Sequence, residues 1–121
     1  MQSRDNRTFI AGESLSAAQF KFVTLESDGQ VDLADSAGEN AIGVCLAGAA
    51  AGAAVTVCVS GSVMVEAGGT IAAGAQIQTG ADATALTAAA GDVVLGYARE
   101  AGVDGQIIEI EMIQGGNVVP A

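Results

Sequence analysis

One pattern occurs twice along this chain of 121 residues. Residues 42–59 begin with Ile-Gly-Val-Cys, place a second glycine nine residues after the first, and continue with valines at alternate positions. Residues 95–112 begin with Leu-Gly-Tyr-Ala and then follow the same order, 53 positions later. Leu33 and Leu86 have the same spacing of 53. Such a repeat predicts two structurally similar units rather than one irregular fold.

The repeat extends upstream with a different spacing. Residues 11–15, Ala-Gly-Glu-Ser-Leu, resemble residues 67–71, Ala-Gly-Gly-Thr-Ile, at an offset of 56. The change in offset indicates a connection that is about three residues shorter in the second copy. We therefore predict half-domains at about 11–60 and 67–113 that pack against each other, since a small repeat cannot bury an apolar face alone.

Apolar and polar side chains alternate between the many glycine turns. In residues 107–112, Ile108 and Ile110 fall on one face of an extended chain, and Glu109 and Glu111 fall on the other. Period-2 alternation of this kind is typical of strands, and no segment shows the spacing of an amphipathic helix. The predicted fold class is all-β, a compact small β-barrel or sandwich built from two similar half-domains. We expect an extended N-terminal arm at residues 1–10, the β-domain at 11–113 and a flexible C-terminal tail at 114–121.

Residues 41–65 contain no charged side chain, and 25 such residues could cross a bilayer. The second copy, residues 95–112, carries five charges in the equivalent region and could not. Acidic residues, Glu39 and Glu66, flank the run, whereas basic residues usually border a membrane span. We therefore predict strands at 42–46 and 55–60 joined by a loop at 47–54, and no membrane association.

Charge and composition limit the partners. The net charge is −10, which disfavours binding to nucleic acid phosphates, although Arg4 and Arg7 leave the first ten residues weakly positive. That arm suits an acidic partner or is an ordinary solvated terminus. Aromatic residues make up only 3%, so the core is built of small side chains and buries little area per residue. We expect oligomerisation or docking onto a larger body to bury further surface.

The residues for most catalytic and cofactor chemistry are missing. The chain has no histidine, which removes histidine-dependent catalysis and the commonest transition-metal ligand. Cys45 and Cys58 form no zinc motif and are expected to be buried reduced thiols. We predict no catalytic residues, no metal site and no cofactor.

Other conspicuous residues have structural interpretations. The acids around Asp28-Gly29 do not match a calcium loop and are expected to surround a hairpin turn, facing solvent. Glu109 and Glu111 are expected on a solvated or partner-facing strand face. Tyr97 corresponds to Val44 and is expected in the core. Phe9 and Ile10 either cap the end of the barrel or anchor the arm onto a partner.

The order of turn and strand signatures resembles the capsid decoration, or cement, proteins of tailed bacteriophages. The matching pieces cover residues 11–113: AGE, SDGQV, AIGV, the loop and strand AAAGAAVTV, the segment GSVMVEAGGTIAAG, and VLGYA followed by DGQIIEIE. The resemblance implies a non-enzymatic virion protein, made in the host cytoplasm, that joins the outside of the head. It would bind the major capsid protein, bridge neighbouring copies, and act as a homo-oligomer, with a trimer favoured.

The resemblance also directs attention to contact residues. Terminal arms in this family often touch the capsid, so Arg4, Arg7, Phe9 and Ile10 are capsid-contact candidates, and we expect removal of residues 1–9 to leave the β-domain folded. The bland loop suggests a subunit or shell interface at five residues, Gly48, Ala49, Ala50, Ala51 and Gly52. The alternative function is a surface-displayed β-type binding module, for example for carbohydrate.

Overall fold

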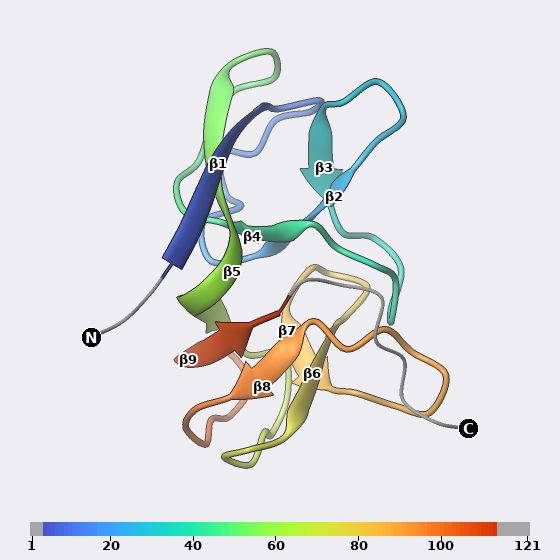
Figure 1. Ribbon diagram of the computed structural model, residues 1–121, viewed down its shortest axis with the longest axis vertical. Coiled ribbons are helices and arrows are strands. Elements are labelled where there is room, and N and C mark those ends of the chain that lie inside the picture. The colour runs from blue at the N-terminus through green and yellow to red at the C-terminus, as the bar shows by residue number, and fades with distance from the viewer. Residues whose placement is uncertain (1–3, 114–121) are drawn as a thin grey trace.

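A computed structural model describes residues 4–113, and every regular element in that range is a β-strand. The nine strands are β1 (Arg4–Ile10), β2 (Phe22–Leu25), β3 (Val31–Leu33), β4 (Gly43–Cys45), β5 (Ala54–Glu66), β6 (Gln76–Thr79), β7 (Ala85–Thr87), β8 (Gly96–Ala98) and β9 (Ile107–Met112) (Figure 1). The predicted all-β class is confirmed. The described part of the chain contains no helix of the length and apolarity needed to cross a bilayer.

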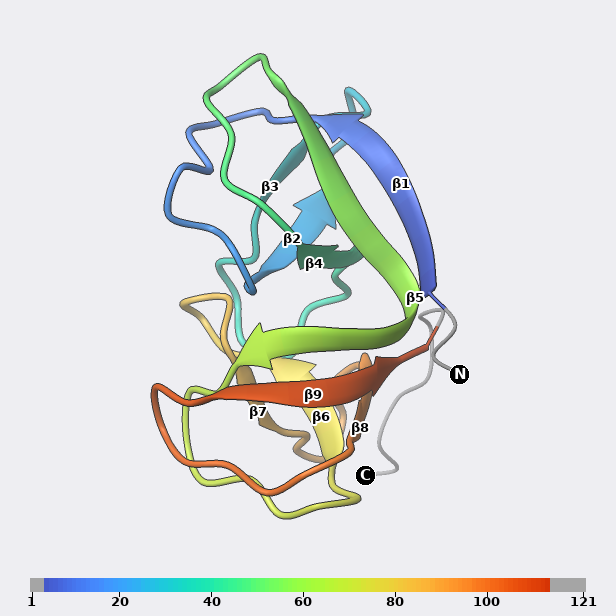
Figure 2. The same ribbon diagram turned by 90° about the vertical axis from the view of Figure 1, so that its left-hand side faces the viewer.

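All strand pairs are antiparallel, and they form one strongly curled sheet in the order β3-β2-β4-β5-β9-β8-β6-β7, with β1 paired to β5. The long strand β5 runs through both halves of the molecule and bends between them (Figure 2). Gly61, where the pairing of β5 passes from β1 to β9, has a φ of 94°, a conformation that glycine adopts without steric cost. The uncharged run 41–65 is thus strand β4, a loop and strand β5, in the predicted order, but β5 continues to Glu66, beyond the predicted end at residue 60.

The two halves have the same topology. In the first, β2 pairs with β3 and β4, and β4 pairs with β5; in the second, β6 pairs with β7 and β8, and β8 pairs with β9. The backbone hydrogen bonds match as well. The Leu15 amide donates to Ala49 at 2.7 Å, and its counterpart, the Ile71 amide, donates to Gly102 at 2.9 Å. The predicted internal repeat is therefore present in three dimensions.

The expected N-terminal arm needs correction over residues 4–10, because this segment is strand β1. It pairs with the first part of β5, with Phe9 opposite Val55 and Ile10 opposite Ala54. The second part of β5 pairs with β9 in the same register, with Val65 opposite Ile108. Strand β1 is thus the counterpart of residues 61–66, and the halves run from 4 to 60 and from 61 to 113. We call these the first half and the second half.

Each half closes around its own small core. A parallel bridge from Ala11 to Val31 closes the curl of the first half, and one from Ala67 to Ala85 closes the second. The first-half cluster includes Leu15, Val23 and Val57, and Phe9 packs against it. The second cluster also contains first-half residues, among them Phe22, which is fully buried between the halves. Phe9 therefore helps to cap a core, one of its two expected roles.

Three details depart from the expectations. Tyr97 is 41% exposed, although Val44 at the equivalent position is fully buried, so Tyr97 is not a core residue. The predicted equivalence of Leu33 and Leu86 is wrong by one residue. Leu33 lies opposite Val23, and Thr87 lies opposite Ile77, the counterpart of Val23, so the spacing here is 54. The second half is therefore shortened at two connections rather than one, and together these account for the three residues by which its connection was predicted to be shorter. The expected tail at residues 114–121 lies outside the described residues, as do Met1 to Ser3.

The cysteines and the first acidic turn agree with the expectations in most respects. Cys45 and Cys58 are both buried reduced thiols, and burial raises the pKa of Cys45. The chain turns between β2 and β3 at Gly29, which has a φ of 84°. The carboxylate of Asp28 accepts a bond of 3.0 Å from the Gln30 amide, and this bond fixes the turn.

Candidate functional site

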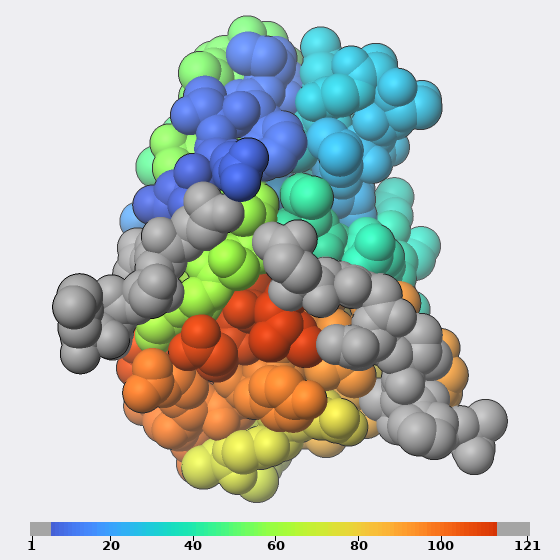
Figure 3. Space-filling model, in the orientation of Figure 1, coloured from blue at the N-terminus to red at the C-terminus, as the bar shows by residue number. Residues whose placement is uncertain are grey.

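An uncharged surface occupies one end of the first half. It consists of Ile10, residues 14–19 and residues 47–54, none of which is charged. Apart from Leu15 and Ala18, which are buried, and Ala49, which is half-buried, these residues are exposed, Ile10 by 41%. The loop and the end of β1 lie side by side at the top of the molecule (Figure 3). We call this region the apical surface.

Backbone contacts fix the apical surface without large side chains. Leu15 and Ala49 exchange two backbone hydrogen bonds, of 2.7 and 3.3 Å. The Gly52 amide donates to the Ala11 carbonyl at 2.8 Å, and Gly52 has a φ of 84°. At Gly48, a Cβ atom would lie 2.6 Å from the Ser16 carbonyl oxygen, so glycine permits the close approach of the two loops. These contacts hold the loop from 47 to 54 in one conformation against residues 11–16.

The second half carries charge at the equivalent place. Its loop from 100 to 107 includes Glu100 and Asp104, and Glu66 takes the place of Ile10. The matched position of Ala50 is Val103, since each accepts the hydrogen bond that closes the loop. The loops 47–54 and 100–107 have matching backbone hydrogen bonds, but only the second contains charged residues. The fold therefore does not require the first loop to be uncharged.

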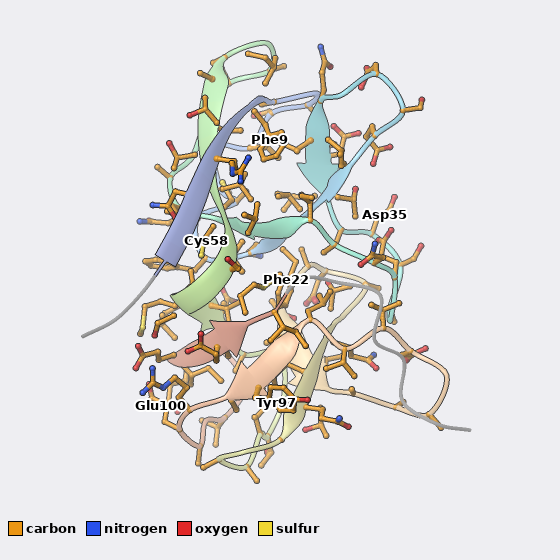
Figure 4. All side chains as sticks on the ribbon, in the orientation of Figure 1. Phe9, Phe22, Asp35, Cys58, Tyr97 and Glu100 are labelled. Atoms are coloured by element: carbon orange, nitrogen blue, oxygen red, sulfur yellow. The ribbon has the colours of Figure 1, made fainter. Side chains whose placement is uncertain are left out.

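A groove of about 220 Å³ lies on another side of the first half. Its lining residues are Arg7 and Phe9 from β1, Ile42 before β4, and Val59 from β5. Arg7 and Phe9 alternate with Thr8 and Ile10 along β1, so the strand directs the first pair to the groove side and the second pair to the opposite face. Figure 4 shows Phe9 directed into the first half from β1.

An acidic cleft of about 410 Å³ lies beside β2 and β3. Its carboxylates include those of Glu13, Glu26, Asp32 and Asp35. Burial, and then the nearby acids, raise the pKa of Asp32, and its buried Oδ1 atom has no hydrogen-bond partner among the described residues. Asp32 thus departs from the prediction of fully solvent-facing acids. Within residues 4–113, no group of three or more acidic or cysteine side chains is arranged to hold a metal ion.

The paired acids of β9 form a local surface network. Glu109 and Glu111 alternate with buried Ile108, Ile110 and Met112, as predicted. Arg99 lies 4.0 Å from Glu109 and 3.6 Å from Glu111, and Ser62 donates a hydrogen bond to Glu109. Exposed ion pairs of this kind contribute little to stability.

The structure divides the predicted contact residues into two sets. Ile10 lies opposite Ala54, at the end of the loop that contains the interface candidates Gly48 to Gly52. Arg7 and Phe9 instead line the groove, and Arg4 begins β1 opposite Gly61. The sequence did not reveal residues 14–19 as part of the apical surface. The absence of charge in that segment was a usable signal, but its place beside the loop depends on the fold.

The sequence of the chain matches a known protein family over most of its length. The phage cement protein family matches residues 1–111, and the chain belongs to this family. It is therefore a structural phage protein associated with the capsid, and a component of the virion.

One solved structure with the same fold is described as the head fiber gp8.5 N base in bacteriophage phi29. The identity is 20%, the TM-score is 0.71, and the alignment covers 92% of this chain and 95% of the other. No curated protein matches the chain.

Proposed function

We propose that the protein binds the outer surface of a phage head and stabilises the shell by bridging neighbouring major capsid proteins. Family membership supports a capsid partner, and the acidic character of the chain supports an outward position facing solvent. Synthesis in the host cytoplasm and a structural, non-enzymatic role belong to the same proposal. So does the trimer that the family resemblance favours.

The uncharged apical surface is the observation that carries this proposal. Docking removes water from both surfaces, and burying a charge without a partner is costly, so interface cores are depleted of charged residues. On a chain with a net charge of −10, Ile10 and the loop 47–54 form a surface that can be covered without this cost. Small side chains also let the partner approach the backbone closely. The apical surface is therefore our candidate for the capsid contact.

Binding to heads that lack the protein tests the proposal. Ala50→Glu places a charge on the apical surface, and Val103→Glu places the same charge at the matched exposed position of the second half. We expect Ala50→Glu to weaken head binding at least about tenfold, because docking would bury a charge that has no partner. We expect Val103→Glu to bind as the unmodified protein does. Equal affinity of the two variants for heads would contradict the assignment of the apical surface as the capsid contact.

Stabilisation of the shell is a separate measurement. Heads saturated with the protein should resist heating better than bare heads, because a ligand that binds only the intact shell stabilises it by mass action. Occupancy by Ala50→Glu at the same protein concentration should give a smaller gain. Heads that bind the protein but unfold at the same temperature as bare heads would contradict the bridging role.

The carbohydrate-binding alternative finds no support in the arrangement of aromatic side chains. Phe22 is fully buried, Phe9 packs on a core, and Phe20 is half-buried. Only Tyr97 is largely exposed among the four. A single aromatic ring is a poor platform for a sugar, so we retain the capsid role alone.

A further inference from the structure

The two halves of the chain pack through a defined interface. Four backbone hydrogen bonds join loop and strand residues of the two halves: Phe22 to Ala83 at 2.9 Å, Gly38 to Thr79 at 2.9 Å, Glu66 to Phe20 at 2.8 Å and Val93 to Gly38 at 3.1 Å. On the first-half side, Phe22, Val44 and Cys58 form a row across β2, β4 and β5. All three are fully buried in the same cluster as the second-half core.

The second half has the same row, but no element within residues 4–113 covers it. The equivalent residues are Gln76, Tyr97 and Glu111, which lie opposite one another on β6, β8 and β9. Gln76 and Tyr97 are exposed, and Glu111 is half-buried beside Arg99. We call Gln76, Tyr97 and Glu111 the distal face.

The surface that receives the first row also has an uncovered counterpart. In the second half, the receiving side includes Val63, Val65, Thr79 and Leu95, all 1% exposed or less. The equivalent first-half residues are Arg7, Phe9, Leu25 and Ile42, all exposed or half-buried, with Leu25 exposed by 49%. We call these four the proximal face; three of them are apolar, and three of them line the 220 Å³ groove.

We propose that copies of this chain associate head to tail, with the distal face of one copy covering the proximal face of the next. The contact would repeat, between chains, the packing that the first half makes on the second half within a chain. Large apolar residues left open at repeat positions that are buried elsewhere in the same chain indicate a missing neighbour. The neighbour whose shape already fits is another copy of the same repeat. Such a heterologous contact forms a ring when its rotation closes.

The chemistry of the two faces suits a contact that forms after folding. Tyr97 replaces buried Val44 and supplies a large ring with a polar hydroxyl, a residue type common at the centres of protein interfaces. The groove offers apolar walls at Phe9, Ile42 and Val59 that a ring can fill. The two faces also carry opposite charges, at Arg7 on the proximal face and Glu111 on the distal face. The faces are more polar than the internal interface and remain soluble before association.

Two variants that each damage one face test the proposal. Tyr97→Glu spoils the distal face, and Leu25→Glu spoils the proximal face; both side chains are exposed in the single chain, so both variants should fold. We expect the unmodified chain to self-associate at concentrations up to about 0.1 mM, and each variant alone to do so at least about tenfold more weakly. Sedimentation equilibrium measures the masses, and Val103→Glu, on neither face, should associate normally.

Mixing the two variants gives the decisive result. Each retains the face that the other lacks, so the mixture should form a one-to-one complex of twice the 11.8 kDa chain mass and stop there. The proposal is overturned if the mixture stays monomeric, if the unmodified chain is monomeric throughout, or if either variant associates as the unmodified chain does. Thermal unfolding of each variant confirms that it is folded. These measurements use no heads, so their failure is distinguishable from failure of capsid binding through the apical surface.

Discussion

Gly43 and Gly96 occupy the same position in the two halves, and at both the place of a Cβ atom is taken by a carbonyl oxygen of the adjacent strand. The oxygen belongs to Cys58 in the first half and to Glu111 in the second. Neither glycine has a positive φ, so space rather than backbone conformation requires glycine here. The repeat thus preserves a close approach of β4 to β5 and of β8 to β9.

Alanine at either glycine should therefore push two paired strands apart. We expect Gly43→Ala and Gly96→Ala each to lower the free energy of unfolding by about 1–3 kcal/mol, the usual cost of overpacking. Gly69→Ala is the control, because its Cβ would meet only an ordinary contact of 3.5 Å with Leu86. Urea denaturation measures all three. A change at Gly43 no larger than that at Gly69 would show that β4 can move away from β5.

Removal of β1 should destabilise the first half, contrary to what its position at the terminus suggests. Deletion of residues 1–10 takes a seven-residue ladder from β5 and removes Phe9 from the first-half core. We expect a loss of about 3 kcal/mol, comparable to truncation of a core phenylalanine. Denaturant unfolding followed by circular dichroism measures this. Unchanged stability would restore the idea of a separate arm.

Gly29 and Ala83 occupy one turn position, with φ of 84° and 69°. The left-handed conformation costs an ordinary residue about 1–2 kcal/mol, and at Ala83 burial of the methyl group offsets part of this cost. Nothing lies within 4 Å of a Cβ at Gly29, so Gly29→Ala should lose about 1 kcal/mol without compensation. Thermal unfolding gives the comparison, with Ala83→Gly expected to be nearly neutral. A neutral Gly29→Ala would contradict this strain.

Two aspartates predict opposite effects of pH. Burial, helped by Glu13 and Glu26, raises the pKa of Asp32, so the stability linked to its protonated form is present below the ordinary value of 3.8 and is lost as pH rises through the folded-state pKa. A hydrogen bond from the Thr84 hydroxyl lowers the pKa of Asp82, so its contribution is present above 3.8 and is lost as pH falls through its folded-state pKa.

The corresponding amides separate the two cases. Asp32→Asn should raise the melting temperature at pH 7 by an amount that shrinks as the pH approaches 3.8, because the folded carboxyl is then already neutral. Asp82→Asn should lower the melting temperature at pH 7, and by less in acid. Differential scanning calorimetry at several pH values measures both. Shifts of the same sign for the two variants would contradict the assignment.

The sequence was sufficient to predict the strands and the duplication, because alternation and glycine spacing survive divergence in the segments around Gly43 and Gly96. It did not reveal that β1 belongs to the repeat. Arg7 stands where the second half has Val63, and Ile10 stands where it has Glu66, so the two segments share little more than an apolar residue at Phe9 and Val65. Pairing with β5 identifies the relationship, and pairing is a property of the fold.

The error at Tyr97 has a different origin. Val44 is buried in a cluster to which both halves contribute, whereas the second half has no such neighbour at Tyr97 within residues 4–113, so equivalence within the repeat does not transfer burial. The apical surface shows the same limit: absence of charge in the loop 47–54 was visible, but the adjacent segment 14–19 joins it through the Leu15–Ala49 backbone bonds. The alternation of residue types along the sequence thus predicts the strands well, but it does not predict which segments they contact in the fold.

Amide hydrogen exchange on the protein bound to heads tests the central claim most directly, because the two halves provide matched loops in one molecule. Exchange should slow on binding in residues 47–54 and 14–19, and should be unchanged in residues 100–107, the charged counterpart of the loop. Slowed exchange confined to residues 100–107, with none at 47–54, would contradict the assignment of the apical surface as the capsid contact.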